Sequence, residues 1–532
     1  MPHLCSRTLL ALCGVILIGL SPPLKAQQQD PLFGPTVRWQ DDDGAALWVG
    51  TDVAIGDDGA TVISAKELNQ PMISVYSSIV GEALFDHPLP YAFQIRVDAA
   101  ERSTEMAAMV LHHRRPGSTK SMAPELWFWN DANDPEPAWK FPFPEADSWF
   151  YKGMDVHVSA DGQTIVAWNT YTRERRNLIH VFDVDGTIRG TFETTQEFNS
   201  SAGEQVLVSQ DMRRLLMDVG GHPQLIDLET GELLKESRHH SLWSGHTLSG
   251  DGRTVAIGDE AEVRIHREDA NGKFPRIDTY TLPSHQNASQ LALDGDGSHL
   301  AILASTSSPA DQLDLVVYDV NAAVTIELHR FSAPNNNDSV AATGLQMTED
   351  AAMIVGSTYG DGDGLIPDAF AFQPGLGVTA EIFTDGSAFA CDMDSTGQVF
   401  AVATKDKHAN SFGTGGDIVC ADTRLVPLRV TGLPRLGHTL TARIEGAHDQ
   451  AWVVAASALG QSATPWGVSQ LDLATAKVQG LVPMHHGAAE RHLRLPTAPA
   501  ANGMAIHVQA GFVDDGRPAG ALTNRISFRI QG

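Results

Sequence analysis

The chain has 532 residues, of which 42% are apolar and 19% are charged. This composition is typical of a folded globular protein and excludes wholesale disorder. The 65 acidic residues outnumber the 37 basic ones and give a formal net charge of −28, which excludes a protein that binds nucleic acid or anionic lipid through a basic surface. At roughly 100–200 residues per domain, the length predicts several domains, or one large repeat domain with a smaller one.

The first 26 residues are predicted to be a secretory signal peptide. Arg7 ends a short basic region, and Leu9–Leu20 is an apolar run of 12 residues, too short to span a bilayer comfortably. A Ser-Pro-Pro break follows, and Ala26 offers a small residue for cleavage before Gln27. The alternative is an uncleaved anchor. We therefore expect a secreted or periplasmic protein that has no membrane-inserted segment after cleavage.

Residues 53–403 repeat one pattern, in which a short apolar strand, a polar turn and a second apolar strand follow one another. The clearest copies have Asp-Gly in the turn, as in VAIGDDGATVIS (53–64), VHVSADGQTIVAW (156–168), HTLSGDGRTVAIG (246–258) and LALDGDGSHLAIL (291–303). The eight turns lie 40 to 55 residues apart, with an average near 48, which indicates a repeat protein. The glycines of four turns are expected to adopt positive φ in tight hairpins, namely Gly59, Gly162, Gly252 and Gly297.

A third strand and then a fourth follow most of these pairs, as in LIHVFDVDG (178–186) and DLVVYDVNA (314–322). The strands are rich in Val, Ile and Leu, and no segment of a dozen residues has clean helical periodicity. Four strands in each unit are typical of β-propeller blades, which bury their faces by stacking in a closed ring. The eight turns predict an all-β, eight-bladed propeller. A seven-bladed ring is the alternative if residues 91–144 are an insertion.

The two ends of the repeat region predict how the ring closes and where it stops. The last repeat, 385–424, has three clear strands, and PTVRW (35–39) is expected to supply the fourth. After residue 425, alternating strands such as WVVAAS (452–457) are separated by Gly, Pro and Asp turns, which predicts a small β-sandwich. The predicted division is a signal peptide at 1–26, a propeller at 27–424 and a β-sandwich at 425–532.

The repeats and the C-terminal segment both resemble known families. Residues 37–424 resemble the WD-repeat-like and YVTN-type β-propellers of secreted bacterial proteins, and GLQMTEDAAMIVGSTYG with DAFAF resembles their HAF-type repeats. The third strands carry Phe-Asp, Ile-Asp or Tyr-Asp where eukaryotic repeats carry Trp-Asp. The C-terminal segment resembles the terminal sandwich modules of secreted bacterial proteins. These resemblances imply a fold and carry no activity.

Two cysteines remain after signal cleavage, Cys391 and Cys420. An oxidising compartment permits a disulfide between them. Their predicted places are the first and third strands of one blade, which puts their Cα atoms about 9.6 Å apart. A disulfide needs Cα atoms within about 7 Å. We therefore expect two free, buried thiols.

One loop offers candidate metal ligands. Asp361, Asp363 and Asp368 lie in GDGDGLIPD, and alternating carboxylates on a Gly-rich loop can converge on Ca²⁺. The match to an EF-hand loop is partial, because Leu365 and Phe372 stand where oxygen ligands are needed. The alternative is a solvated loop between the second and third strands of a blade.

The densest aromatic stretch is WFWNDANDPEPAWKFPFPEADSWFY (127–151). Alternate side chains of a strand point to opposite faces, so half of this set can be exposed, where it would stack on sugar rings or grip a partner. The candidate ligand-binding residues are Trp127, Trp129, Trp139, Trp149 and Tyr151. The alternative is that the rings pack between blades.

No recognised catalytic motif is present: the sequence has no G-x-S-x-G, no Walker-type loop, no H-E-x-x-H and no C-x-x-C-H. The first functional hypothesis is therefore a secreted, non-catalytic recognition or scaffolding propeller that binds a protein or carbohydrate partner through rim loops. The second is a metal-assisted, lactonase-like hydrolase or a lyase, with Asp, Glu and His at the channel mouth. No cofactor is expected apart from the Ca²⁺ for which the loop offers ligands. Carboxylates and histidines that converge at the channel mouth would favour the enzyme.

Overall fold

The computed structural model describes residues 37–41, 47–113, 122–145, 153–171, 174–195, 206–218, 222–237, 245–259, 262–283, 286–306, 310–334, 340–361, 364–409, 411–423, 428–445, 450–464, 467–484, 488–514, 517–523 and 525–532. These ranges form strands together with two 3-10 helices, Asp57–Gly59 and Pro499–Ala501. No helix within them is long and apolar enough to cross a membrane.

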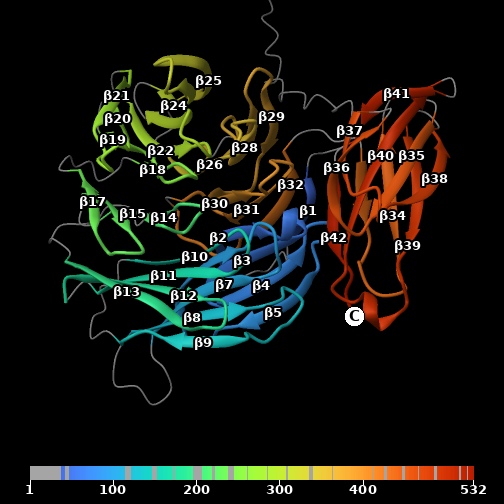
Figure 1. Cartoon of the computed structure of the whole chain (residues 1–532), viewed down its shortest axis with the longest axis horizontal. Coiled ribbons are helices and arrows are strands. Elements are labelled where there is room, and N and C mark those ends of the chain that lie inside the picture. The colour runs from blue at the N-terminus through green and yellow to red at the C-terminus, as the bar shows by residue number, and fades with distance from the viewer. Residues whose placement is uncertain are drawn as a thin grey trace, which may run out of the picture. The chain divides into compact units, whose positions relative to one another are not determined.

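Between residues 37 and 422, the described strands form eight antiparallel sheets of four strands each, arranged around a common centre (Figure 1). The first four sheets consist of β2 (Trp48–Gly56), β3 (Thr61–Leu68), β4 (Met72–Ser77) and β5 (Ala83–Pro88); β6 (Ala92–Ala99), β7 (Met106–His112), β8 (Ala123–Trp129) and β9 (Trp139–Pro142); β10 (Met154–Val158), β11 (Thr164–Tyr171), β12 (Arg176–Asp183) and β13 (Ile188–Thr195); and β14 (Val206–Val208), β15 (Arg214–Asp218), β16 (Pro223–Asp227) and β17 (Leu233–Glu236).

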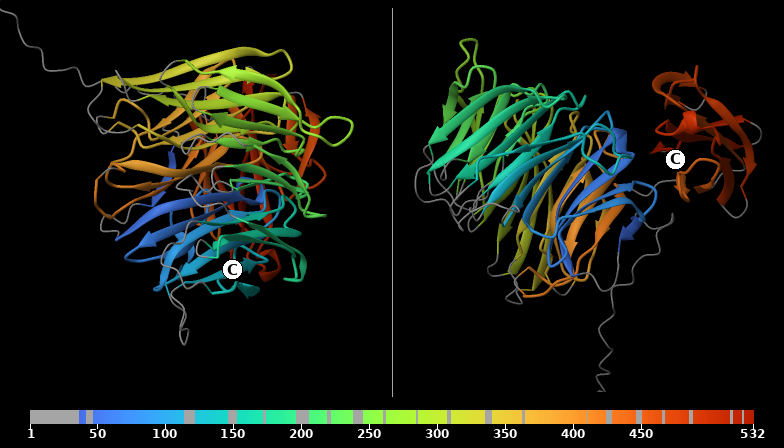
Figure 2. Two further views of the ribbon diagram at one scale, coloured as in Figure 1. Left: turned by 90° about the vertical axis from the view of Figure 1, so that its left-hand side faces the viewer. Right: turned by 90° about the horizontal axis from the view of Figure 1, so that it is seen from below.

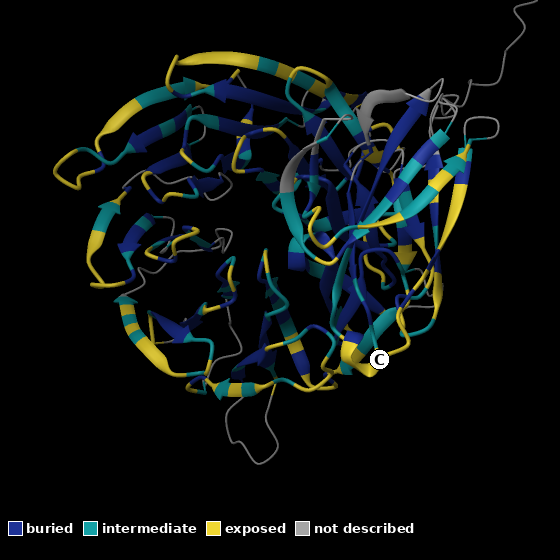
Figure 3. Ribbon diagram, turned by 45° about the vertical axis from the view of Figure 1, so that its right-hand side comes forward, coloured by how far each residue is buried: buried dark blue, intermediate teal, exposed yellow. Residues whose placement is uncertain are grey.

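The other four sheets consist of β18 (His246–Leu248), β19 (Thr254–Asp259), β20 (Glu262–Arg267) and β21 (Arg276–Thr281); β22 (Asn287–Leu293), β23 (His299–Thr306), β24 (Ala310–Asp319) and β25 (Val324–Pro334); β26 (Ala342–Met347), β27 (Ile354–Thr358), β28 (Ala369–Gln373) and β29 (Gly377–Ile382); and β30 (Ser387–Met393), β31 (Val399–Lys405) and β32 (Ile418–Asp422) with β1 (Val37–Asp41). Each sheet is named below by its first strand in the repeat, from β2 to β30. First strands of neighbouring sheets contact one another, as β2 contacts β6 and β30, and β22 contacts β18 and β26, and the sheets surround an open centre in Figure 3. Residues 92–142 form a sheet like the others, so the stretch that had suggested an insertion is part of the repeat.

Apolar side chains join each sheet to the next. Eight buried clusters lie in this part of the chain, and each combines residues of two consecutive sheets. One of them joins the β30 sheet to the β2 sheet. The β2 sheet contributes Trp48 and Tyr76 to it, and the β30 sheet contributes Ala401 and Ile418. Burial of apolar surface on both faces of every sheet is the main source of stability in such an arrangement.

Hydrogen bonds in the turns explain the repeated Ser-x-Asp-Gly sequence. In the β10 sheet the Ser159 hydroxyl donates to Oδ1 of Asp161 (2.7 Å) and accepts from the backbone N–H of Thr164 (2.9 Å). The same pattern recurs where Ser209, Ser249 and Thr348 precede an aspartate by two positions. The predicted positive φ is confirmed, with values of 81°, 71°, 69° and 71° at Gly59, Gly162, Gly252 and Gly297.

The N-terminal strand β1 completes the last sheet, as the sequence predicted, by pairing antiparallel with β32. A buried ion pair accompanies this pairing, in which Nη2 of Arg38 lies 2.7 Å from Oδ1 of Asp422 and the two side chains are 6% and 1% exposed. At the other end of β1, Asp41 accepts hydrogen bonds from Tyr76 and from Lys66 (2.7 Å), which belong to the β2 sheet. Both ends of β1 are therefore held by charged contacts as well as by the sheet.

Cys391 and Cys420 are free, buried thiols, as predicted. They lie on β30 and β32, with β31 between them. Burial raises the pKa of each thiol to about 12. Because the thiolate is the reactive form of cysteine, both side chains are inert at neutral pH.

The C-terminal strands form sheets of their own, drawn in orange to red in Figures 1 and 2. They are β33 (Leu428–Thr431), β34 (Thr439–Glu445), β35 (Gln450–Ala456), β36 (Leu459–Thr464), β37 (Gly467–Leu471), β38 (Lys477–Pro483), β39 (Ala488–Arg494), β40 (Ala505–Asp514), β41 (Arg517–Leu522) and β42 (Ile526–Arg529). The sheet β33-β34-β39 and the sheet around β35 and β40 bury one apolar cluster, which includes Leu440, Val453 and Phe528.

Candidate functional site

The aromatic stretch predicted to bind a ligand is packed inside the protein. Trp127 and Trp129 are 5% and 0% exposed, in the cluster between the β2 and β6 sheets, and Nζ of Lys140 lies 3.4 Å from the Trp127 ring centroid. Trp139 stacks on Phe128 with ring centroids 5.0 Å apart. The interpretation of an exposed row is thus corrected for these three side chains, because their rings fill the spaces between sheets. The other two candidates, Trp149 and Tyr151, lie outside the described residues.

Two of the carboxylates predicted to bind a metal accept hydrogen bonds from loop backbone. Oδ1 of Asp361 accepts the N–H groups of Leu365 (2.8 Å) and Ile366 (3.1 Å). Oδ2 of Asp368 accepts the N–H of Thr384 (2.6 Å), and burial raises the pKa of Asp368 to about 7. Asp363 lies outside the described residues. Within the described part of the chain, no group of three or more His, Cys, Asp or Glu side chains is placed to hold a metal ion.

The structure does bring ionisable side chains together on the first strands of four consecutive sheets, a grouping that the sequence analysis missed. We call this group the axial cluster. Its members are Asp392 on β30, Asp52 on β2, Arg96 and Asp98 on β6, and Asp155 and His157 on β10.

Three carboxylates of the axial cluster tie each first strand to the next. Asp392 accepts the backbone N–H of Ile55 (2.6 Å). Asp52 accepts that of Val97 (3.0 Å), and Asp98 accepts that of Val158 (2.6 Å). His157 continues the series, because its Nε2 donates to the carbonyl of Val206 on β14 (2.9 Å). These hydrogen bonds run from sheet to sheet, so the cluster joins neighbouring sheets.

Burial is the largest influence on the protonation of the axial cluster. It raises the pKa of Asp52 and Asp392 to about 7, although the N–H groups that they accept oppose this rise. It also raises the pKa of Asp98 well above its usual range and that of Asp155 above its usual value, while His157 and Arg96 lower the latter. Crowding of like charges adds to the effect, because a second carboxylate nearby disfavours ionisation.

Replacement of Asp392 by asparagine should change how stability depends on pH. A carboxyl whose pKa is near 7 when folded and near 4 when unfolded stabilises the fold below about pH 4, and this contribution is lost as pH rises through 7. Asparagine keeps an acceptor for Ile55 and does not titrate. Between pH 5 and pH 8, Asp392→Asn should therefore lose about 2.5 kcal/mol less unfolding free energy than the parent protein, because each pH unit between 5 and 7 is worth about 1.4 kcal/mol.

Urea unfolding at the two pH values measures this difference. Asp161→Asn is the matched control: the Ser159 hydroxyl lowers the pKa of Asp161, so that carboxyl is ionised in both states above pH 5. Relative to the parent protein, Asp161→Asn should lower the free energy of unfolding by the same amount at pH 5 as at pH 8. An identical pH dependence for Asp392→Asn and the parent protein would contradict the raised pKa.

A second site lies on the turn face, which we define by the turns between first and second strands. Turns of six sheets line a hollow of about 620 Å³ there. The lining residues are Arg102, Ala160, Gln210, Asp211, Gly250, Asp251, Gly295, Asp296 and Glu349. Backbone hydrogen bonds join adjacent turns, such as Gln210 N–H to Gly250 O (2.9 Å) and Gly295 N–H to Glu349 O (2.9 Å). These hydrogen bonds join the turns of the β14, β18, β22 and β26 sheets into one belt beside the hollow.

Side chains from three different sheets meet across this hollow. Nε2 of Gln210 donates to Oε1 of Glu349 (2.6 Å), and Nη2 of Arg102 lies 3.6 Å from the same oxygen. The Arg102 and Glu349 side chains are 60% and 46% exposed. An ion pair this exposed contributes little stability, about 0–1 kcal/mol. Partner groups can therefore displace it at small cost.

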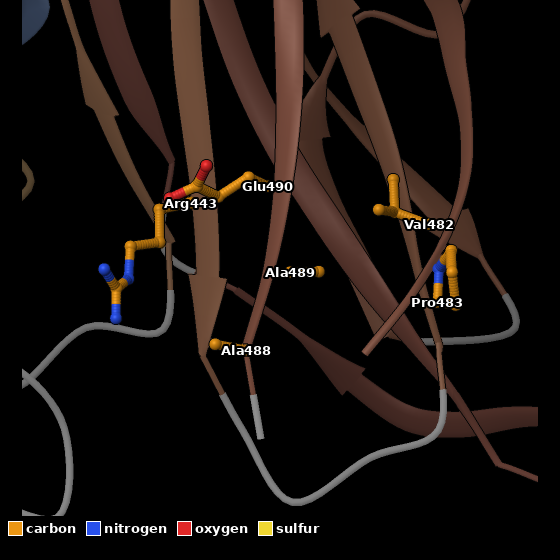
Figure 4. A pocket seen from close by; sticks show the side chains of 6 residues that line it. All are labelled: Arg443, Val482, Pro483, Ala488, Ala489 and Glu490. Carbon is orange, nitrogen blue, oxygen red and sulfur yellow. The ribbon is translucent and has the colours of Figure 1, made fainter. Parts of the chain in front are cut away.

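A second hollow, of about 450 Å³, lies on the C-terminal sheets (Figure 4). Arg443 and Glu490 stand on one side of it, and Val482, Pro483 and Ala489 on the other. It holds one basic and one acidic side chain on neighbouring strands. This hollow shows no convergence of reactive groups.

No protein-family model and no curated protein matches the sequence. Among solved structures, the chain is similar to the C-terminal WD40 domain of Sif2, with 11% identity over 71% of this chain and 97% of that one and a TM-score of 0.48. It is also similar to Sqt1 of Saccharomyces cerevisiae, with 10% identity over 72% and 97% of the two chains and a TM-score of 0.47. The sheets described above make the protein all-β, with eight antiparallel sheets of four strands, and both likenesses concern the fold alone.

Proposed function

We propose that the protein is a non-catalytic recognition or scaffolding propeller that binds a partner protein through the turn face. In this proposal the eight four-stranded sheets are the blades of one closed ring, and the C-terminal sheets are a β-sandwich appended to it. The observation that carries the proposal is the turn-face hollow, which is open to solvent and lined by exposed turns from six sheets. Loops positioned by a rigid scaffold are where binding residues concentrate.

The chemistry of the two sites supports binding over catalysis. Asp52, Asp98 and Asp392 already accept backbone N–H groups of the neighbouring sheet, so they serve the structure of the ring. The turn face carries several carboxylates and an amide, and these suit hydrogen bonding to a partner. A carbohydrate partner loses its main support, because Trp127, Trp129 and Trp139 pack between sheets.

The location proposed for this function is the periplasm or the cell exterior. Its support is the apolar run Leu9–Leu20 with the small residue Ala26 behind it. Mass measurement of the N-terminus of the exported protein tests this location, and a chain that begins at Gln27 is expected. A chain that begins at Met1 would contradict cleavage before Gln27 and favour the uncleaved anchor.

A blocking substitution tests the proposed binding face. Ala160→Trp places a large ring in the turn-face hollow, whereas Glu193→Trp places the same ring on the exposed outermost strand β13. Partners captured from the native organism are identified by mass spectrometry with each immobilised protein. We expect one partner that binds the parent protein and Glu193→Trp and is lost with Ala160→Trp. Equal capture by all three proteins would overturn the assignment of the turn face.

One observation favours the alternative of a metal-assisted hydrolase or lyase. His157 lies between two carboxylates, with Nδ1 3.8 Å from Oδ2 of Asp98 and Nε2 3.7 Å from Oδ2 of Asp155. Imidazole and carboxylate groups at this spacing are used as general bases and as metal ligands. A bound divalent metal and a lactonase activity that is lost in His157→Gln would establish this alternative.

A further inference from the structure

The turn face already binds guanidinium groups that belong to this same chain. In the first turn of the β2 sheet, the carboxylate of Asp57 accepts hydrogen bonds from Nε and Nη2 of Arg529, which lies on β42. Nη2 of Arg525 donates to the backbone carbonyl of Asp58 (3.2 Å). A forked contact of this kind matches the planar donors of arginine to the two oxygens of a carboxylate. One turn of the turn face thus serves as an arginine acceptor.

Equivalent turns in the β14, β18 and β22 sheets carry exposed aspartates that line the hollow. Asp211, Asp251 and Asp296 each use Oδ1 to hold their own turn, by accepting the N–H of Arg213, Arg253 and Ser298. The three side chains are exposed and line the hollow of about 620 Å³.

Arg102 occupies part of that hollow in the way that a partner's arginine would. It is the one basic side chain among nine lining residues, four of which are acidic. Its guanidinium approaches Glu349, which also accepts a hydrogen bond from Gln210. Gly295 lets the β22 and β26 turns approach closely beside the hollow, since a Cβ there would lie 3.0 Å from the Glu349 carbonyl oxygen.

From these observations we infer that the turn-face hollow receives an arginine side chain of the partner protein, and that Arg102 is an internal stand-in that the incoming guanidinium displaces from Glu349. The inference rests on the proposed recognition function and gives the partner its chemistry, an exposed arginine on an otherwise basic or neutral surface. The charge of the region between residues 27 and 424 agrees with it, because that region has 59 acidic and 26 basic side chains. Long-range attraction would bring a cationic partner toward this surface.

A capped tripeptide with a central arginine, Ac-Gly-Arg-Gly-NH₂, serves as the probe in calorimetric titrations of the full chain. We expect saturable binding that Glu349→Gln weakens about tenfold, the effect of one charge-assisted hydrogen bond. Arg102→Ala should tighten binding about threefold, because it removes a weak exposed competitor. The citrulline peptide, which has the same shape without the charge, should not bind, and the lysine peptide should bind more weakly.

Two control variants separate a specific site from the general negative field. Glu193→Gln and Arg189→Ala change the net charge by the same amounts as the test variants, at exposed positions of β13. Both should leave the arginine affinity unchanged. Absence of saturable binding, or equal effects of test and control variants, would overturn the inference.

The two proposals fail in distinguishable ways. If Ala160→Trp abolishes partner capture and the arginine peptide does not bind, then the turn face is the binding face and the arginine inference is wrong. If the peptide binds as expected and Ala160→Trp still captures the partner, then the arginine site exists and the proposed recognition face is wrong.

Discussion

Replacement of Arg38 by methionine is expected to lower the free energy of unfolding by about 3–5 kcal/mol, because it leaves the buried carboxyl of Asp422 without its partner. Burial already raises the pKa of Asp422 against the effect of Arg38. Without the guanidinium, the carboxyl must take up a proton or remain as an uncompensated charge in the last sheet. Both outcomes weaken the attachment of β1 to β32. Urea unfolding monitored by tryptophan fluorescence measures the loss.

Two further variants show whether the ion pair itself is the cause. The double variant Arg38→Met/Asp422→Leu replaces both charges by apolar groups of similar size and should recover most of the lost stability. Arg189→Met breaks the exposed pair with Asp183 and should cost less than about 1 kcal/mol. A loss for Arg38→Met no greater than that for Arg189→Met would mean that the buried pair does not hold the closing strand.

The second large effect is expected from Gly297→Ala, at about 3 kcal/mol. Gly297 has φ +71°, and a Cβ built there lies 2.3 Å from Oγ1 and 2.4 Å from Cβ of Thr254. Strain from positive φ and overlap with a buried side chain each cost about 1–3 kcal/mol. Thr254 has little freedom to move, because it is fully buried and its Oγ1 accepts a hydrogen bond from Arg267. Thermal and urea unfolding of the purified variant measure the loss.

Gly375→Ala is the matched control for this substitution. Gly375 has φ +82°, and a Cβ there meets nothing within 4 Å, so only the backbone strain of about 1 kcal/mol remains. The reverse change, Ala351→Gly, should stabilise the protein by about 0.5–1 kcal/mol. Ala351 has φ 54° and occupies the position in its turn that Gly297 occupies in the β22 sheet. Equal losses at Gly297 and Gly375 would show that the overlap with Thr254 relaxes at no cost.

The repeat architecture could be predicted because its signals are local. Ser159, Asp161 and Gly162 lie within one turn, and each has a separate physical task there, as hydrogen-bond donor, acceptor and residue with positive φ. The strand β1 was predictable from a count of strands in the last repeat. The two thiols were predictable from strand spacing alone, because β31 stands between Cys391 and Cys420.

The sites could not be predicted in the same way, because they depend on contacts between repeats. Asp98 in the sequence is a polar residue within a strand, and nothing local distinguishes a solvent-facing carboxyl from one that accepts the N–H of Val158, 60 residues later. Gln210 and Glu349 are 139 residues apart and meet only when the ring is assembled. One signal was available: Asp98 stands between Val97 and Ala99, and Asp392 between Cys391 and Met393, and a carboxyl in apolar surroundings needs a partner.

The pairing of β1 with β32 has a consequence for the order of events in folding. Arg38 and Asp422 are 384 residues apart, and closing a loop of that length costs about 5 kcal/mol of chain entropy. Among the strands of the eight sheets, β1 is therefore the first to leave the ribosome and the last to find its partner, after seven complete sheets have been made. Contacts of such long sequence separation slow folding. Until β32 arrives, β1 remains an unpaired strand segment, and the rate of this single late step sets how long the chain stays open to proteases and to association with other copies.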